Sequence, residues 1–354
     1  TKTLLEQRLD RPKTVLVVST HFGLAHQFVS IKKKLEQEEG VKMILFVQVT
    51  DDSPQKMWYV SGSDVISVPS EKTKRELEAY AQKAGFEKVQ IEVVAYPVSP
   101  LLGDYLPEKR YRNRLSQLRA QGDTPIHVAI PISGAAVGTK FFIEFIERLT
   151  RLSTRFRFHI IVKNAPYTKS FVNALWRYKN VDLKVHLTDR EVVDDYEALY
   201  RRETISLEVT KPSEQSFKAL LNPSQIGGSI LLFSDPVGRQ EYDNLDFLRR
   251  HFLIPSTEEQ KKLLSSVQEK RQIDLKKFTR WRGLQLPDKP KTAADFVFWC
   301  LKEEIFSRMG RCQVQPKESD PHKRELHSNG VREFWHNVAR VIKASAQEVM
   351  DQAD

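Results

Sequence analysis

Short apolar runs alternate with amphipathic stretches along most of this sequence of 354 residues. Apolar runs of a few residues predict buried strands, and apolar residues spaced three and four apart predict helices. The predicted strands fall at 14–19, 43–49, 64–70, 91–97, 126–131, 158–163, 183–187, 206–210 and 229–234. The first of these runs is uninterrupted, which predicts a strand buried on both faces. Such alternation is typical of an α/β protein, here with two doubly wound domains.

The chain is long enough for two domains with separate cores. A basic, helical segment at 106–121 leads into Gly122-Asp-Thr-Pro125, which is typical of a linker. This predicts a first domain at 1–121 and a second at 122–256. From Thr257 onward helical stretches alternate with loops and no strand is expected, so that 257–354 is predicted to be a helical extension.

The net positive charge of the chain suggests a negatively charged partner. The formal net charge is +10, with 40% hydrophobic and 29% charged residues, as in an ordinary globular protein. No apolar run approaches the length of a membrane span, and the first residues do not form a secretory leader, so we expect a cytoplasmic protein. Its two cysteines, Cys300 and Cys312, and its scattered histidines predict neither disulfide nor metal site.

Three kinds of negatively charged partner could bind such a basic protein. Nucleic acid is not expected, because the basic residues are scattered and no nucleic-acid-binding module is recognisable. The anionic inner face of a membrane is a second candidate, and the diphosphate of a nucleotide sugar is a third. A solvated basic surface without any specific partner stays open as an alternative.

The stretch 206–244 has the pattern of a phosphate-binding site. The strand at 206–210 ends at Lys211-Pro-Ser213, and helical spacing begins at Ser216. Proline suits the first turn of a helix, where hydroxyls and free backbone N–H groups attract an anion. A second strand, at 229–234, ends in a polar turn before Asn244. Because the carboxyl ends of neighbouring parallel strands meet at one edge, the two turns predict one ligand crevice.

Two runs in this stretch, Thr210-Lys-Pro-Ser-Glu-Gln-Ser-Phe-Lys-Ala-Leu220 and Gly238-Arg-Gln-Glu-Tyr-Asp-Asn244, also resemble a known family. They are similar to the donor half of the GT-B glycosyltransferases that include lipid-II-forming N-acetylglucosaminyltransferase and monogalactosyldiacylglycerol synthase. In that group a strand, a small-residue turn and a helix hold the nucleotide diphosphate. A Gln-(Gln/Glu)-x-x-Asn signature then faces the donor sugar. The resemblance covers roughly 15–253.

The resemblance implies a GT-B fold, with two facing Rossmann-like domains and a last helix, at 331–349, that packs back on the first domain. A small-residue turn after 126–131 corresponds to the interdomain glycine loop of the family. The donor-binding residues that the resemblance implies are Gly134, Val185, His186, Leu187, Lys211, Ser213, Glu214, Gln215, Ser216, Gly238, Arg239, Gln240, Glu241 and Asn244.

On the acceptor side the resemblance points to strand-end loops of the first domain. Gly23 and His26 match its first loop, and Asp51 followed by Trp58 is similar to the galactolipid synthases. A carboxylate just past a strand end can take the proton of an acceptor hydroxyl. Asp51 is therefore the predicted base, ahead of His26. Helix capping or packing by these two residues stays open as an alternative.

The implied activity is inverting, metal-independent transfer of a hexose from a nucleotide diphosphate, expected to be UDP, to an unidentified lipid, glycan or small molecule, without a cofactor. Two departures from the family are notable. Ala219 stands where a ribose-binding Glu is usual, so that either Glu214 binds the ribose instead or the chain is a divergent branch with another donor or activity. Ser99 stands where an Arg is common. A nucleotide-sugar epimerase of the same fold, or a degenerate transferase that only binds, are the alternatives.

Overall fold

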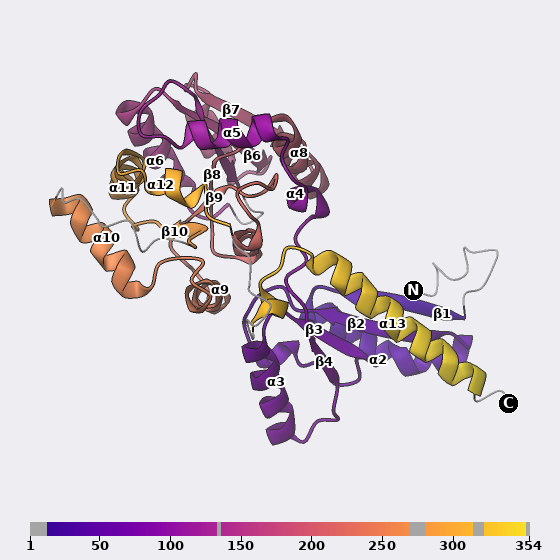
Figure 1. Ribbon diagram of the computed structural model, residues 1–354. Coiled ribbons are helices and arrows are strands. Elements are labelled where there is room, and N and C mark those ends of the chain that lie inside the picture. The colour runs from indigo at the N-terminus through magenta and orange to yellow at the C-terminus, as the bar shows by residue number, and fades with distance from the viewer. Residues whose placement is uncertain (1–12, 133–135, 270–279, 314–321, 352–354) are drawn as a thin grey trace. The chain divides into compact units, whose positions relative to one another are not determined.

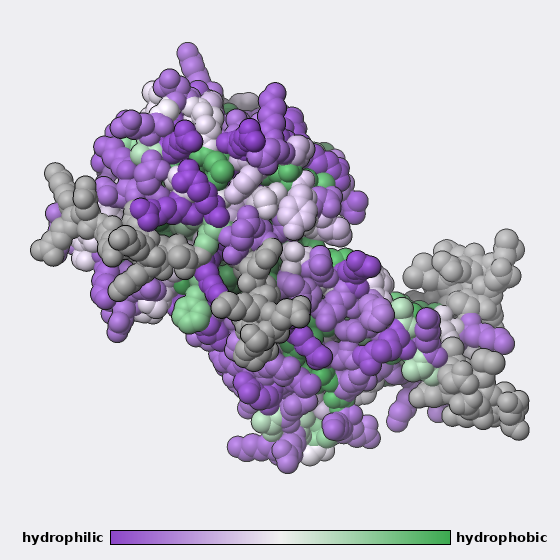
Figure 2. Space-filling model, viewed as in Figure 1, coloured by the Kyte–Doolittle hydropathy of each residue, from purple (hydrophilic) through white to green (hydrophobic). Residues whose placement is uncertain are grey.

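The structure is a computed structural model that describes residues 13–132, 136–269, 280–313 and 322–351, and side chains as far as residue 345 (Figure 1). Contacts divide the chain into two units. Unit 1 comprises Thr1–Pro97 and Pro316–Asp354, and unit 2 comprises Val98–Gln315. Among the described residues no helix is both long and apolar enough to cross a bilayer. Figure 2 shows a mostly hydrophilic surface on the face in view.

Unit 1 contains a four-stranded parallel sheet in the order β1-β2-β3-β4. Its elements are β1 (Thr14–Ser19), α2 (Phe22–Glu39), β2 (Lys42–Gln48), η1 (Lys56–Trp58), β3 (Val65–Val68), α3 (Glu71–Ala84), β4 (Gln90–Val93), η4 (Lys323–Glu325) and α13 (Gly330–Asp351). Helix α3 begins where the Ser70 side chain accepts a hydrogen bond from the Thr73 N–H group, and it ends at Gly85 in the left-handed conformation.

Helices from both ends of the chain cover the sheet of unit 1. Helices α2 and α3 pack on one face, while α13 lies across the other, where Phe334 contacts Phe46 edge to face (Figure 1). Gly330 starts α13 against the chain after β4, where a Cβ atom would lie 2.1 Å from the Ala95 carbonyl oxygen. The strand order does not reverse in this sheet, so the helices that connect its strands all lie on the same face. The second face is covered by a segment from the far end of the sequence.

Strand β1 was predicted to be buried on both faces, but it lies at the edge of the sheet and is not fully buried on either face. Its middle residues are only half-buried, and Val18 is 36% exposed. An uninterrupted apolar run shows that both faces of a strand are apolar, but it does not specify how many neighbours the strand has.

Unit 2 contains a six-stranded parallel sheet in the order β10-β9-β8-β5-β6-β7. The strands are β5 (Ile126–Pro131), β6 (Phe156–Lys163), β7 (Val181–His186), β8 (Leu207–Thr210), β9 (Ile230–Phe233) and β10 (Gly283–Gln285). The helices are α4 (Pro100–Gly103), α5 (Glu108–Gln117), α6 (Thr139–Leu152), α7 (Lys169–Leu175), α8 (Asp189–Arg202), η2 (Glu214–Leu220), α9 (Arg239–Arg250), α10 (Thr257–Glu269), α11 (Pro290–Lys302) and α12 (Ile305–Met309).

The sheet of unit 2 is doubly wound. Its main core lies between the sheet and a face formed by α6, α7 and α11, which contribute Phe145, Phe171 and Phe296. Helix α8 contacts β6 and β7 in the other layer. The strand order reverses between β5 and β8. In sheets of this kind a crevice opens at the carboxyl ends of the two strands where the order reverses.

Strand β10 was not predicted, since the sequence after residue 257 was expected to be helical. The strand is short and is held by contacts from distant residues: the Leu231 N–H group donates to the Arg282 carbonyl at 2.9 Å, and Leu286 donates to Phe233 at 2.7 Å. A Cβ atom on Gly283 would lie 2.8 Å from the Phe233 ring, so glycine allows the close approach. The local spacing of apolar residues does not reveal these long-range contacts.

Several side chains hold helix α5 to unit 2, and Arg114 is the largest of those that are fully buried. The Arg114 guanidinium donates to four backbone carbonyls, those of Ile205 at 2.9 Å, Pro223 at 2.5 Å, Gln225 at 2.6 Å and Ile226 at 2.7 Å. Burial lowers the pKa of Arg114 to about 9. The predicted domain boundary after residue 121 therefore falls inside unit 2, and the division itself lies at Pro97.

Candidate functional site

The two polar runs singled out in the sequence meet at the carboxyl edge of the unit 2 sheet. They follow the neighbouring strands β8 and β9, which pair in parallel. The Asn244 side-chain amide donates to the Pro212 carbonyl at 3.0 Å, and Lys211 Nζ lies 3.5 Å from Glu241 Oε1. The turn after β8 is thus fastened to the first turns of α9, and this edge adjoins the reversal between β5 and β8.

The helix expected after this turn is not an α-helix. Segment η2 is a 3₁₀ helix of seven residues, and the Ser216 N–H group donates to the Ser213 carbonyl at 2.8 Å. A short 3₁₀ helix has little macrodipole to attract a phosphate, so this part of the prediction is corrected. Instead, the Ser216 hydroxyl is buried and has no hydrogen-bond partner among the described residues. Glu214 is exposed, and Gln215 is half-buried.

Two of the three predicted sugar-binding residues on α9 make contacts within the protein. Glu241 is buried, and its Oε2 accepts a hydrogen bond from the Val237 N–H group at 2.7 Å, while Asn244 is fully buried. The Gln240 amide is half-buried and makes no hydrogen bond within the described part of the chain. A Cβ atom on Gly238 would lie 2.7 Å from Gln240 Oε1, so that a larger residue there would displace the end of this flexible side chain.

Arg239 supplies a cation next to Gln240. Its side chain is 68% exposed and lies 3.5 Å from Asp243 in the next turn of α9. An exposed pair of this kind is weak, so the guanidinium can reorient toward a phosphate. In this second run Arg239 and Gln240 thus have groups to offer a ligand, and so does Tyr242, which is 56% exposed.

The segment expected to contact the nucleobase lies at the other edge of the sheet. Val185 and His186 end β7, and His186 Nε2 lies 2.9 Å from Asp195 Oδ2. Leu187 follows and is 73% exposed, and Tyr167, in the loop after β6, is 55% exposed. Two strands lie between β7 and β8, which amounts to roughly 14 Å at the usual strand spacing. The segment 185–187 therefore does not adjoin the turn after β8.

The loop after β5 is described only in part. Gly134 lies outside the described residues. Beyond it, Ala136 has a φ of 46° and Gly138 has a φ of 87°, both in the left-handed region. Gly138 precedes α6, whose first turn receives no side-chain cap. The strand order places this loop beside the turn after β8.

In unit 1 the predicted catalytic residues follow the neighbouring strands β1 and β2. His26 is exposed on α2, and its Nε2 lies 3.0 Å from the carbonyl oxygen of Met57 in the loop after β2. Asp51 is half-buried at the end of β2 and receives a long hydrogen bond, 3.4 Å, from Thr50 Oγ1. The structure thus brings the His26 side chain onto the loop that contains Asp51.

The two residues predicted on the acceptor side make internal contacts. Trp58 is 6% exposed, and its ring packs edge to face on Phe22 at 5.6 Å within the core of unit 1. The Gly23 N–H group donates to the His21 ring at 3.1 Å, which caps α2. These contacts give both residues a role in holding the first loop in place.

Sequence reasoning missed a buried polar network directly under the turn after β8. Lys218, on η2, forms an ion pair with Glu208 of β8 and donates to the Tyr196 hydroxyl at 2.5 Å. Tyr196 donates to Glu208 at 2.8 Å, and Tyr200 also donates to this carboxylate. Burial lowers the pKa of Lys218 and raises the pKa of both tyrosines well above their usual value. The sequence held one sign of this network, because Glu208 and Lys218 are charged residues within apolar runs.

The two positions that depart from the resembled family are also occupied internally. Ala219 is fully buried on η2. The Ser99 hydroxyl donates to Glu197 Oε1 on α8 at 2.8 Å. Neither position offers a free polar group to a ligand.

No model of a known protein family matches this sequence, and no curated protein matches it. Among solved structures, UDP-GlcNAc 2-epimerase from Neisseria meningitidis bound to UDP-GlcNAc is similar, with a TM-score of 0.51 and 12% identity over 96% of this chain and 80% of that chain. The S. aureus MnaA-UDP co-structure gives a TM-score of 0.50 and 11% identity, over 96% of this chain and 80% of that chain.

A structure of a putative UDP-N-acetylglucosamine 2-epimerase from Listeria monocytogenes gives a TM-score of 0.50 and 12% identity, over 95% of this chain and 74% of that chain. At such low identity these likenesses show the fold alone. Together with the two parallel sheets, of four and six strands, they confirm the predicted fold class: the protein is an α/β protein with a GT-B-like structure.

Proposed function

We propose that this protein is an enzyme that uses a nucleoside-diphosphate sugar, expected to be a UDP-sugar, bound at the carboxyl edge of the unit 2 sheet. The observation that carries the proposal is the joining of the two polar runs at this edge, beside the reversal between β5 and β8. Asn244 and Glu241 hold the turn after β8, while Arg239 and Gln240 stay available to a ligand. A cation and a free amide suit a phosphate and a sugar hydroxyl, respectively.

The Ser216 hydroxyl supports the proposal independently. A buried polar group without a partner costs roughly 1–3 kcal/mol, and proteins rarely keep one without a reason. Ser216 lies on η2, directly after the turn whose carbonyl Asn244 holds. A phosphate oxygen or a sugar hydroxyl at this edge would supply the missing partner once the turn before η2 moves aside, because Ser216 is fully buried. The proposed donor site therefore comprises Ser216, Arg239 and Gln240, with Ser213 and Glu214 on the same turn.

We propose transfer of the sugar to an acceptor as the reaction, with direct inversion and without a metal or cofactor. Asp51 of unit 1 is the proposed base and His26 its neighbour, because both follow strand ends and neither is fully buried. The acceptor, whether lipid, glycan or small molecule, is left open. The second candidate is epimerisation of the donor sugar, and the likeness to structures that bear the name UDP-GlcNAc 2-epimerase favours it.

Ser216→Ala separates ligand binding from stability. Without ligand we expect the variant to be as stable as the wild type or slightly more stable, because it removes an unsatisfied buried hydroxyl. Its affinity for UDP or UDP-GlcNAc should fall roughly 5- to 100-fold, the equivalent of one hydrogen bond to a charged or buried group. Thermal unfolding and isothermal titration calorimetry measure the two effects.

The matched control for this variant is Ser265→Ala, which removes an exposed hydroxyl on α10 that donates to the Lys262 carbonyl. It should change neither affinity nor stability. If the wild type binds no nucleoside diphosphate or nucleotide sugar in calorimetry, the proposed donor site is refuted. Equal affinity of Ser216→Ala and the wild type would instead remove Ser216 from it.

An NMR assay with UDP-GlcNAc distinguishes the two candidate reactions. Epimerisation changes the coupling of the sugar C2 proton in the intact nucleotide sugar and needs no acceptor. Transfer releases UDP only when an acceptor is added. We expect no change at C2 with the enzyme alone, and UDP release with a suitable acceptor from a panel of lipids, glycans and small molecules. Appearance of the 2-epimer without any acceptor would establish the second candidate.

A further inference from the structure

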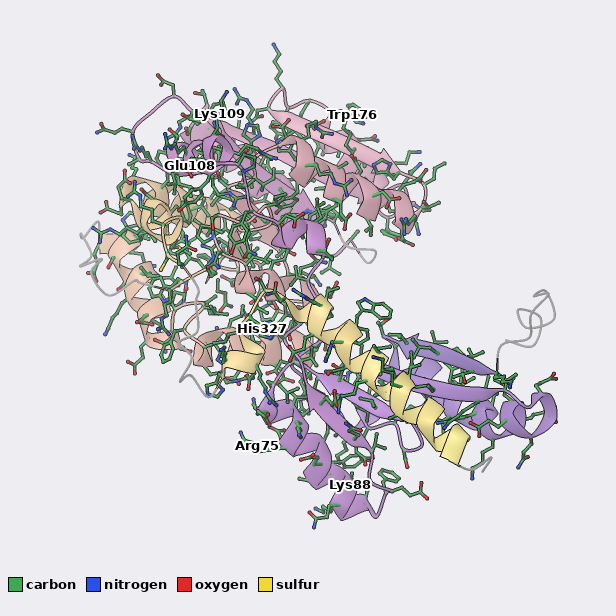
Figure 3. All side chains as sticks on the ribbon, turned by 45° about the vertical axis from the view of Figure 1, so that its right-hand side comes forward. Arg75, Lys88, Glu108, Lys109, Trp176 and His327 are labelled. Atoms are coloured by element: carbon green, nitrogen blue, oxygen red, sulfur yellow. The ribbon has the colours of Figure 1, made fainter. Side chains whose placement is uncertain are left out.

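Unit 1 has a cavity of about 500 Å³ along the outer edge of β4. Strand β4 forms its floor, and its walls come from the first turn of α3 and from a stripe of polar side chains on α13. Figure 3 shows α3 and α13, with Arg75 labelled on α3 and His327 labelled just ahead of α13; neither labelled residue lines the cavity. The size is typical of a ligand site, while the polar and charged lining is unlike the apolar lining of most such sites.

The floor of this cavity is backbone. Strand β4 is the last strand of its sheet, so that one of its edges pairs with no other described strand. The Val94 N–H group donates to the Val68 carbonyl at 3.0 Å, and in a parallel ladder alternate residues face the same neighbour. Ile91 and Val93 consequently turn their N–H and C=O groups to the cavity. Their side chains are only 4% and 8% exposed, and therefore point into the core.

The walls carry charges that lack full partners. Glu92 Oε1 accepts from Arg340 and from Gln90, whereas Glu92 Oε2 is buried without a hydrogen-bond partner among the described residues. Lys74, on α3, and Arg324, on η4, line the same cavity, and neither forms an ion pair within the described part of the chain. Among the described residues, the cavity thus presents an unsatisfied oxygen of Glu92 and two cations without an ion pair, and the carboxylates of Glu71 and Glu333 also line it. An occupant must offer both donor and acceptor groups.

We propose that this cavity binds an extended peptide segment that adds a strand to β4. Such a segment presents alternating N–H and C=O groups, which match those of Ile91 and Val93, and its side chains supply charges. A basic side chain would meet Glu92, and an acidic one would meet Lys74 and Arg324. A single extended segment needs little space beside the strand, whereas the sheet edge of a second copy would arrive with helices of its own. Charged side chains beside a short edge strand commonly prevent pairing with another chain, so they would restrict this edge to a segment of complementary charge.

The test uses a blocked synthetic hexapeptide, Thr-Glu-Val-Lys-Val-Thr, and a control peptide of the same sequence with N-methylated backbone amides. We expect the first to slow amide hydrogen exchange at Ile91 and Val93 of the full chain, and the second to bind at least roughly tenfold more weakly, the equivalent of one lost hydrogen bond. Absence of protection at saturating peptide, or equal binding of both peptides, overturns the proposal.

Glu92→Gln is the matching protein variant. It should lower the affinity for the peptide roughly tenfold or more. The difference in affinity between this variant and the wild type should vanish when norleucine replaces the peptide lysine. Glu76→Gln, on the exposed face of α3, is the control and should bind like the wild type. Lys74→Gln tests the contact with the peptide glutamate in the same way, by its effect on the affinity for the peptide. Protection of Ile91 and Val93 that rises with protein concentration alone, with a doubled mass in light scattering, would assign the edge to a second copy and overturn the peptide proposal.

Discussion

Replacing Lys218 with methionine should lower the free energy of unfolding of unit 2 by about 3–5 kcal/mol, the usual cost of leaving one partner of a buried ion pair behind. The side chain of Lys218 is 3% exposed and that of Glu208 is fully buried. Without the ammonium group, only the hydroxyls of Tyr196 and Tyr200 stay on the Glu208 carboxylate. Urea denaturation of the full chain, followed by tryptophan fluorescence, measures the loss.

The double variant Lys218→Met/Glu208→Gln tests the cause. It removes both charges and keeps an oxygen that can accept from a tyrosine, so more than half of the lost stability should return. Lys140→Met, an exposed change on α6, is the control and should stay within about 0.5 kcal/mol of the wild type. A single variant as stable as the wild type would show that the charge of Lys218 contributes nothing to the fold.

Asp51→Asn should lower the rate of sugar transfer by about 10²–10⁴-fold, the usual contribution of a general base. The substitution keeps the size of the side chain and removes its ability to take a proton. Donor affinity should not change, because the proposed donor site lies wholly on unit 2. His26→Ala should cost less, since its ring is exposed and contacts a backbone carbonyl. Steady-state kinetics of UDP release and calorimetry with UDP give the two quantities.

Equal turnover of Asp51→Asn and the wild type, with an acceptor in hand, would contradict this role. A variant with weaker UDP binding and unchanged turnover would point to a structural effect. The conservative variant Asp51→Glu separates the two explanations further. It restores a carboxylate at a slightly different place, so it should recover part of the rate if Asp51 acts as a base.

The alternation of strands and helices was predictable because each parallel strand leaves a local apolar run and each helix a local period. What the sequence could not show is where a strand lies in the sheet. Strand β1 is as apolar as an inner strand and still lies at an edge, and β10 is recognisable only through its contacts with β9. Helix η2 begins with good helical spacing, yet burial of Lys218 against β8 accompanies a 3₁₀ segment there.

The sequence predicted at which edge of the sheet the two polar runs lie, but it did not predict the role of each residue in them. The two polar runs do lie together, as predicted from parallel strands. Polar residues at such an edge can serve the ligand or the scaffold, and the sequence does not distinguish these roles. Asn244 and Glu241 hold backbone groups, whereas Gln240 and Ser216 have no hydrogen-bond partner among the residues that the structure describes. Only the three-dimensional contacts separate the two pairs.

The return of α13 to the sheet of unit 1 has a consequence for biosynthesis. The strands of unit 1 leave the ribosome before unit 2, but Phe334 and Val338, which cover Phe46 and Val65, are made only after all of unit 2. Closing so long a loop costs entropy and slows folding. Unit 2 is continuous in sequence and can finish its core first. The N-terminal unit is therefore expected to mature last, with one apolar face dependent on chaperones until the C-terminal helix arrives.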